Sequence, residues 1–296
     1  MFDLRYHVTS LAAVFIALVI GILVGVALAS HGLGNTERKS LEDDLRRAQN
    51  RVDALNARVD ALQQNGAASQ TFVNSTYSAL MSDRLKGKRI AVLFVGSVDH
   101  GVESDIATAI KDAGGRAALR IYAVQVPIDA AAIEARLASR PALAKYSTDD
   151  QLRNLGRELG REFVDGNDTP LWSALRNLIL QEATPRFGAS KRSADGVIVV
   201  RSADPQMAQT APFVKGLYEG VADAGMPAVG VARSTNDFSA RTVFQQSQLS
   251  TVDDIDLAAG KLALAIVLSQ PASRADYGLK TRDLLPLVTP VPTPSG

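Results

Sequence analysis

The chain has 296 residues, a formal net charge of +1 and no cysteine. Its length suits one substantial globular domain with accessory segments, and its balanced charge excludes a strong overall field that would attract nucleic acid. The absence of cysteine excludes disulfides, thiolate zinc sites, iron–sulfur clusters and cysteine nucleophiles.

The first predicted element is an apolar helix from Val8 to Ala29, which carries no charged residue. A bilayer core is roughly 30 Å thick and needs about 20 apolar residues as helix, so this segment predicts a single membrane span. Ala27 and Ala29, followed by Ser30, also fit a signal-peptide cleavage site, and cleavage stays open beside an uncleaved anchor. Because the short tail before the span holds no domain, the globular part is predicted to lie outside the cytoplasm.

Small residues recur at every fourth position of this predicted span. Gly21 and Gly25 form the G-x-x-x-G pattern that allows two membrane helices to approach closely, and Ala17 extends the same face. These three residues therefore predict a helix–helix interface. The competing interpretation is that glycine and alanine are simply frequent in membrane helices.

Residues 1–35 comprise the predicted membrane anchor and a short connector. A heptad pattern follows them. Its apolar positions alternate in steps of four and three, and they are Leu41, Leu45, Ala48, Val52, Leu55, Val59 and Leu62. Valine at position a with leucine at position d favours two parallel strands. Residues 36–86 are therefore predicted to form a coiled coil, ended at Asn65-Gly66, and a linking helix from Thr71 to Leu85. The alternative is a single amphipathic helix that packs on the globular domain.

The period changes over residues 87–270, where short β-branched runs alternate with helical patterns. Such alternation predicts an α/β domain, Rossmann-like in outline, with a mostly parallel sheet. The predicted strands are Ile90–Val95, Leu119–Val126, Gly196–Val200, Ala228–Ala232 and Leu249–Val252. The predicted helices are Val102–Ala113, Ile128–Arg140, Gln206–Ala224 and one through Ile266 that is capped by Asp253-Asp254.

Two further segments stand apart from this alternation. A helical insertion at about residues 146–184, with its helices placed between Thr148 and Ala183, is compatible with a helical hairpin lid or a dimerisation arm. Residues 271–296 are rich in proline toward their end, which predicts an extended tail.

The predicted loop from Gly96 to Gly101 is the place where a phosphate site would be expected. It lacks the G-x-G-x-x-G fingerprint because Val98 replaces the second glycine, and no Lys-Ser/Thr pair follows to make a P-loop. Asp99 and His100 lie at a strand's carboxyl end, where α/β sheets bind ligands, but they also suit an ordinary loop. No catalytic triad, cofactor motif or metal-ligand cluster is found, so the sequence predicts no catalytic, cofactor or metal residues.

Five segments of the chain are distinctive: the opening FDLRYHVTSLAAVFIALVIGILVG, the strand GVIVV, and the closing STVDDIDLAAGKLALAIVL, YGLK and LLP. These segments carry a resemblance to the mycobacterial copper transport protein B (MctB) family. It implies a cell-envelope protein assigned to copper transport or efflux, described in the family as forming an outer-membrane channel. Copper is thus a partner by resemblance alone, and no metal ligand is carried over.

Two functional hypotheses follow. The first is copper handling by a non-enzymatic, membrane-anchored dimer. The second is a structural module that presents the α/β domain to an envelope or cell-division partner. An enzyme on the α/β domain rests on fold analogy alone.

Overall fold

The structure is a computed structural model that describes residues 4–31, 34–184, 191–202, 204–235, 241–271 and 274–287. The chain divides into two compact units, Met1–Gln70 and Thr71–Gly296.

The first unit holds helix α1 (Leu4–His31) and most of helix α2 (Gly34–Met81). Within α1, Thr9–Ala27 is the one stretch of the described residues that is long and apolar enough to cross a membrane. The predicted helix end at Asn65-Gly66 is wrong, because α2 continues through both residues to Met81. A glycine inside a helix costs only about 1 kcal/mol, which a 48-residue helix tolerates.

The second unit is built on a seven-stranded sheet in the order β3-β2-β1-β4-β5-β6-β7. All neighbouring strands are parallel except β3, which runs antiparallel to β2. The mostly parallel α/β architecture is therefore confirmed. The strands are β1 (Ile90–Val95), β2 (Arg120–Val124), β3 (Leu180–Thr184), β4 (Gly196–Arg201), β5 (Ala228–Val231), β6 (Ser250–Val252) and β7 (Asp276–Tyr277).

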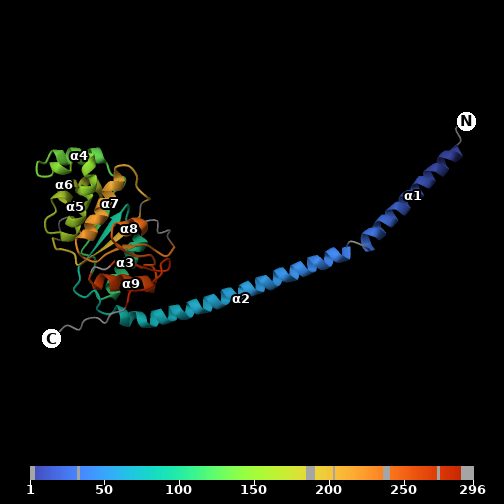
Figure 1. Cartoon of the computed structure of the whole chain (residues 1–296), viewed down its shortest axis with the longest axis horizontal. Coiled ribbons are helices and arrows are strands. Elements are labelled where there is room, and N and C mark those ends of the chain that lie inside the picture. Colours follow the sequence, from blue (N-terminus) through green and yellow to red (C-terminus); the bar gives the residue numbers. More distant parts are fainter. Residues whose placement is uncertain are drawn as a thin grey trace. The chain divides into compact units, whose positions relative to one another are not determined.

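Helices cover both faces of this sheet (Figure 1). One face packs against α4 (Ala130–Ala138), α5 (Leu152–Asp165), α6 (Pro170–Ile179) and α7 (Thr210–Asp223). The other face packs against α3 (His100–Asp112) and α9 (Ala258–Ser269). The side chains of β1 alternate between the two cores, with Leu93 in the first and Val92 and Phe94 in the second. Burial on both faces explains the unbroken apolar run of this strand.

The insertion packs into the globular unit. Its helices α5 and α6 lie in the core, where Leu155, Phe163 and Trp172 are fully buried. Helices α5 and α7 approach backbone to backbone through glycines spaced four apart on each helix, namely Gly156 and Gly160 on α5 and Gly216 and Gly220 on α7. Two side-chain hydrogen bonds flank this contact, from Arg153 to Glu219 (2.9 Å) and from Arg157 to Asp223 (2.7 Å).

The helix predicted to run to Ala183 ends instead at Ile179, and residues from Leu180 form β3. The local sequence LQEA favours helix, but an extended backbone here pairs with the free edge of β2. Tertiary pairing thus overrides a weak local propensity. Helix α8 (Arg241–Gln246) and strand β7, which lies in residues assigned above to the tail, were not anticipated.

Candidate functional site

The predicted assembly residues lie on uncovered surfaces. Ala17, Gly21 and Gly25 are exposed on α1. On α2 the heptad positions are all exposed, with the Leu and Val side chains 49–73% accessible: Leu41, Leu45, Ala48, Val52, Leu55, Val59 and Leu62. Pairing with a second helix would cover apolar side chains spaced in this way. We call these seven residues the α2 seam. Its pairing with a second copy stays a prediction.

The loop after β1 does not assemble a ligand site from Asp99 and His100. The Asp99 carboxylate accepts hydrogen bonds from the backbone N–H groups of Gly101 (2.9 Å) and Val102 (3.1 Å), so it serves as the N-cap of α3. The His100 Nδ1 atom lies 3.1 Å from a Glu103 carboxylate oxygen on the exposed surface. Both residues therefore have local structural partners.

A buried polar cluster lies beyond the carboxyl end of β6. Asp253 and Asp254 are fully buried, and Asp253 pairs with Arg241 of α8. The backbone N–H of Lys280 donates to Asp253 (3.2 Å), while Arg241 donates to the Lys280 carbonyl oxygen (2.9 Å). At Gly278, which has φ +125°, a Cβ would overlap the Asp253 carboxylate. The cluster thus joins β6, α8 and the segment after β7.

The predicted capping role of Asp253-Asp254 is therefore wrong. Helix α9 begins at Ala258, and Leu257 occupies its N-cap position without a side-chain cap. The two carboxylates were identified in the sequence but placed in the wrong role. Arg241 and Lys280, which contact Asp253, lie 12 and 27 residues away from it, so no local sequence pattern indicates these contacts.

Asp254 differs from its neighbours in having no hydrogen-bond partner for either carboxyl oxygen among the described residues. Burial, and then the charges of Asp253 and Asp256, raise its pKa to about 7. By contrast, burial opposes ionisation of Asp256, but hydrogen bonds from the Ser234 N–H and hydroxyl (both 2.6 Å) outweigh it and lower the Asp256 pKa.

Asp254→Asn is expected to remove a pH dependence of stability. Because the native pKa of Asp254 lies above its unfolded value, the native state holds a proton that the unfolded state releases between about pH 4 and pH 7. The free energy of unfolding of the wild type therefore falls across that window by up to about 1.4 kcal/mol per pH unit. We expect the free energy of unfolding of the variant, relative to that of the wild type, to rise steadily from pH 5 to pH 7. Unfolding is followed through the fluorescence of Trp172, the chain's single tryptophan.

Asp256→Asn serves as the control of opposite sign. Ionised Asp256 stabilises the native state at neutral pH, and this contribution is lost below about pH 4. The free energy of unfolding of Asp256→Asn should therefore be lower than that of the wild type at neutral pH, and the difference should shrink in acid. Parallel pH profiles for wild type and Asp254→Asn would contradict the account of Asp254.

Metal-ligating side chains do not gather in the described part of the chain. No group of three or more His, Asp or Glu residues there could hold an ion. Among the methionines, Met81 is fully buried in the core beside α3 and α9, whereas Met207 is 82% exposed. The side chains of His7 and His31 lie outside the described residues.

Comparison with known proteins places the chain. A family described as "Copper transport outer membrane protein, MctB" matches residues 1–286. The chain belongs to this family. The proteins named copper transporter MctB from Mycobacterium bovis and Mycobacterium tuberculosis are each 27% identical to it over 305 aligned positions, covering 90% of this chain and 92% of each relative. The predicted MctB resemblance is confirmed.

The segments that carried the MctB resemblance occupy definite places in the structure. The opening forms most of α1, and GVIVV begins β4. The closing STVDDID extends from β6 toward α9, and YGLK supplies Gly278 and Lys280 to the Asp253 cluster. Two of these segments therefore meet around the ion pair between the buried Asp253 and the partly buried Arg241.

Proposed function

We propose that this MctB-family chain acts in copper transport without catalysis, as a membrane-anchored parallel dimer. The observation that carries the dimer is the α2 seam, whose apolar side chains are exposed along the helix. The heptad order of the seam supports a parallel pair, and two anchors in one membrane share the same sense. The small face of Ala17, Gly21 and Gly25 provides a second contact of the kind that membrane helices use.

The copper role is supported by family membership and by the names of the mycobacterial relatives. Cells that lack the gene are expected to accumulate more cell-associated copper under copper stress than cells that carry it, measured by elemental mass spectrometry. Unchanged copper would reject the copper role. Complementation with a Val52→Glu/Leu55→Glu variant of the α2 seam then tests whether pairing is required. The matched control is Asn50→Glu/Ala57→Glu, which places the same charges on the opposite face of α2.

The location proposed for the globular unit is the envelope side of the membrane, outside the cytoplasm. A C-terminal tag should then be cut by external protease in cells whose outer layers are permeabilised but whose inner membrane is intact. A tag that is protected until lysis would place the unit in the cytoplasm.

A structural role is the second candidate, in which the dimer presents the α/β unit to an envelope or cell-division partner. The same α2 seam supports it, because a seam that only assembles the chain needs no metal chemistry. Unchanged cell-associated copper on gene deletion, together with a persistent dimer and a defect in envelope or division, would favour this role over copper transport.

A further inference from the structure

A basic surface lies at the amino edge of the sheet, where three neighbouring strands begin. Strands β2, β1 and β4 are adjacent and parallel, so the connections that lead into them meet at this edge. Each connection carries at least one exposed cation. We call these four residues the amino-edge cations: Lys88 before β1, Arg116 before β2, and Lys191 and Arg192 before β4.

The amino-edge cations leave this surface with a net positive charge. None of the four makes an ion pair with a described residue. The nearby carboxylate of Asp195 already pairs with Arg89, through Nε–Oδ2 (2.9 Å) and Nη2–Oδ1 (2.8 Å) contacts. These hydrogen bonds from Arg89, together with the charge of Lys88, lower the pKa of Asp195. One carboxylate thus serves two cations, and the others have no counter-charge of their own.

A buried guanidinium adds charge beneath the surface. Arg120, the first residue of β2, is only 3% exposed. Its Nη1 donates to the Phe163 carbonyl oxygen (2.8 Å) and its Nη2 to the carbonyl oxygen of Arg192, while Nε has no hydrogen-bond partner among the described residues. Burial lowers the pKa of Arg120, and the charge of Arg89 adds to this, whereas the charge of Asp165 acts against it. A cation held by neutral carbonyl groups therefore lies directly below Arg192.

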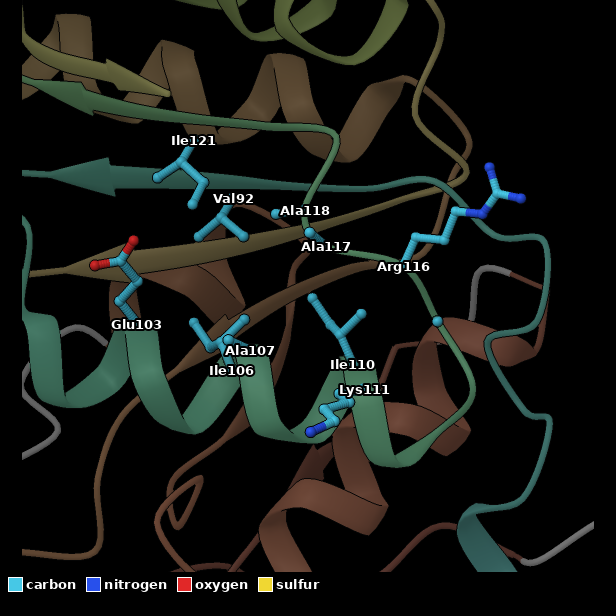
Figure 2. Close-up of a pocket in the computed structure, with 11 residues that line it drawn as sticks. Val92, Glu103, Ile106, Ala107, Ile110, Lys111, Arg116, Ala117, Ala118 and Ile121 are labelled. Carbon is cyan, nitrogen blue, oxygen red and sulfur yellow. The ribbon is translucent and has the colours of Figure 1, made fainter. Parts of the chain in front are cut away.

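The amino-edge cations are spread along the sheet edge. Neighbouring strands lie about 4.8 Å apart, so the connections before β2, β1 and β4 span roughly 10 Å. Figure 2 shows the Arg116 side chain extending away from Ile106 and Ile110 of α3, toward the side of the sheet where β1 begins. A ligand that meets all four cations must therefore be extended and must carry several negative charges.

The composition of the surface selects among anionic partners. The described segments 86–88, 116–117 and 191–192 contain no aromatic and no large apolar residue. They therefore lack the side chains that anchor protein interfaces, stack on single-stranded bases or enter a membrane interface. Lysine and arginine both pair with phosphate, arginine through two N–H groups at once. We propose that the amino edge of the sheet binds a linear, phosphate-bearing polyanion through the amino-edge cations.

The test uses the full chain in nanodiscs of zwitterionic phospholipid and an end-labelled inorganic polyphosphate, with binding followed by fluorescence anisotropy. We expect saturable binding whose affinity falls about 50-fold between about 50 and 200 mM salt, because four neutralised phosphates with a slope of about 0.7 each give that change. The absence of saturable binding at the lower salt concentration, or an affinity that does not change with salt, would overturn the proposal.

Lys88→Gln combined with Arg116→Gln locates the site. With two cations left, the same rise in salt should weaken binding only about 7-fold, and the affinity at low salt should fall about 3- to 10-fold. The matched control is Lys39→Gln combined with Arg58→Gln, which removes the same charge from exposed positions on α2 and should bind as the wild type does. Trp172 fluorescence checks that each variant is folded. Equal weakening by both pairs would overturn the assignment to the amino edge.

Other anions give distinct results that would overturn the proposal. Poly-glutamate of matched charge that displaces polyphosphate equally well would assign the surface to an acidic peptide. Stronger displacement by a single-stranded oligonucleotide would assign it to nucleic acid. Binding to phosphatidylglycerol vesicles that is tighter than binding to polyphosphate, and that is lost in the Lys88→Gln/Arg116→Gln variant, would assign it to a membrane surface.

Discussion

Gly220→Ala is expected to lower the Tm of the globular unit by about 6–12 °C. A Cβ at this position would overlap the Arg157 carbonyl oxygen of α5, so the two helices must separate and lose core packing. Overpacking against backbone costs about 3 kcal/mol or more, and each kcal/mol corresponds to roughly 2–4 °C in a unit of this size. Thermal unfolding followed by Trp172 fluorescence measures the effect in the globular unit, where this side chain is buried.

Gly66→Ala provides the matched control, because nothing lies within 4 Å of a Cβ built there. Alanine is also about 1 kcal/mol more favourable than glycine in a helix. The control should therefore leave the Trp172 transition unchanged or raise the stability of α2. A Gly220→Ala transition within about 2 °C of the wild type would contradict the close approach of α5 and α7.

Val52→Glu combined with Leu55→Glu is expected to dissociate the full-length dimer. The two side chains are 53% and 60% exposed on α2, and a paired seam would bury them in both copies. Loss of that burial costs at least ~4 kcal/mol per dimer, which weakens the dimer about a thousandfold. Single-molecule counting of labelled chains in dilute nanodiscs measures the stoichiometry directly.

The control places the same charges on the opposite helix face, as Asn50→Glu with Ala57→Glu. These positions should leave two chains per nanodisc. If the Val52→Glu/Leu55→Glu variant stays fully dimeric, the interface lies on α1 instead of the α2 seam. In that case Gly21→Leu combined with Gly25→Leu should dissociate the dimer.

The sequence predicts those parts of the fold that local pattern controls. Strand β1 was recognised because its six residues IAVLFV are buried on both faces, and the alternation with α3 indicated parallel neighbours. Strand β3 was missed because LQEAT has no strand signature, and its conformation depends on the free edge of β2. The Rossmann-like outline and the coiled coil stay predictions.

The glycines and the buried carboxylates show the same contrast between features that a local pattern indicates and contacts that form only between distant segments. The glycine spacing of four residues in two predicted helices is a local signal of close helix packing, at Gly156 and Gly160 and at Gly216 and Gly220. The partnership of Asp253 with Arg241 and Lys280 carries no local signal, because it depends on three segments meeting in space.

Cysteine cross-linking in the membrane tests the parallel dimer most directly, because the chain has no cysteine of its own. Leu41→Cys and Leu62→Cys, at opposite ends of the α2 seam, should each form a disulfide between copies, since only a parallel, in-register pair brings both positions within the Cα separation of about 4.4–6.8 Å that a disulfide needs. Asn50→Cys, on the outer face, should stay monomeric under the same oxidant. Two results would contradict the parallel dimer. One is that Asn50→Cys cross-links as efficiently as Leu41→Cys and Leu62→Cys, and the other is that neither seam position cross-links.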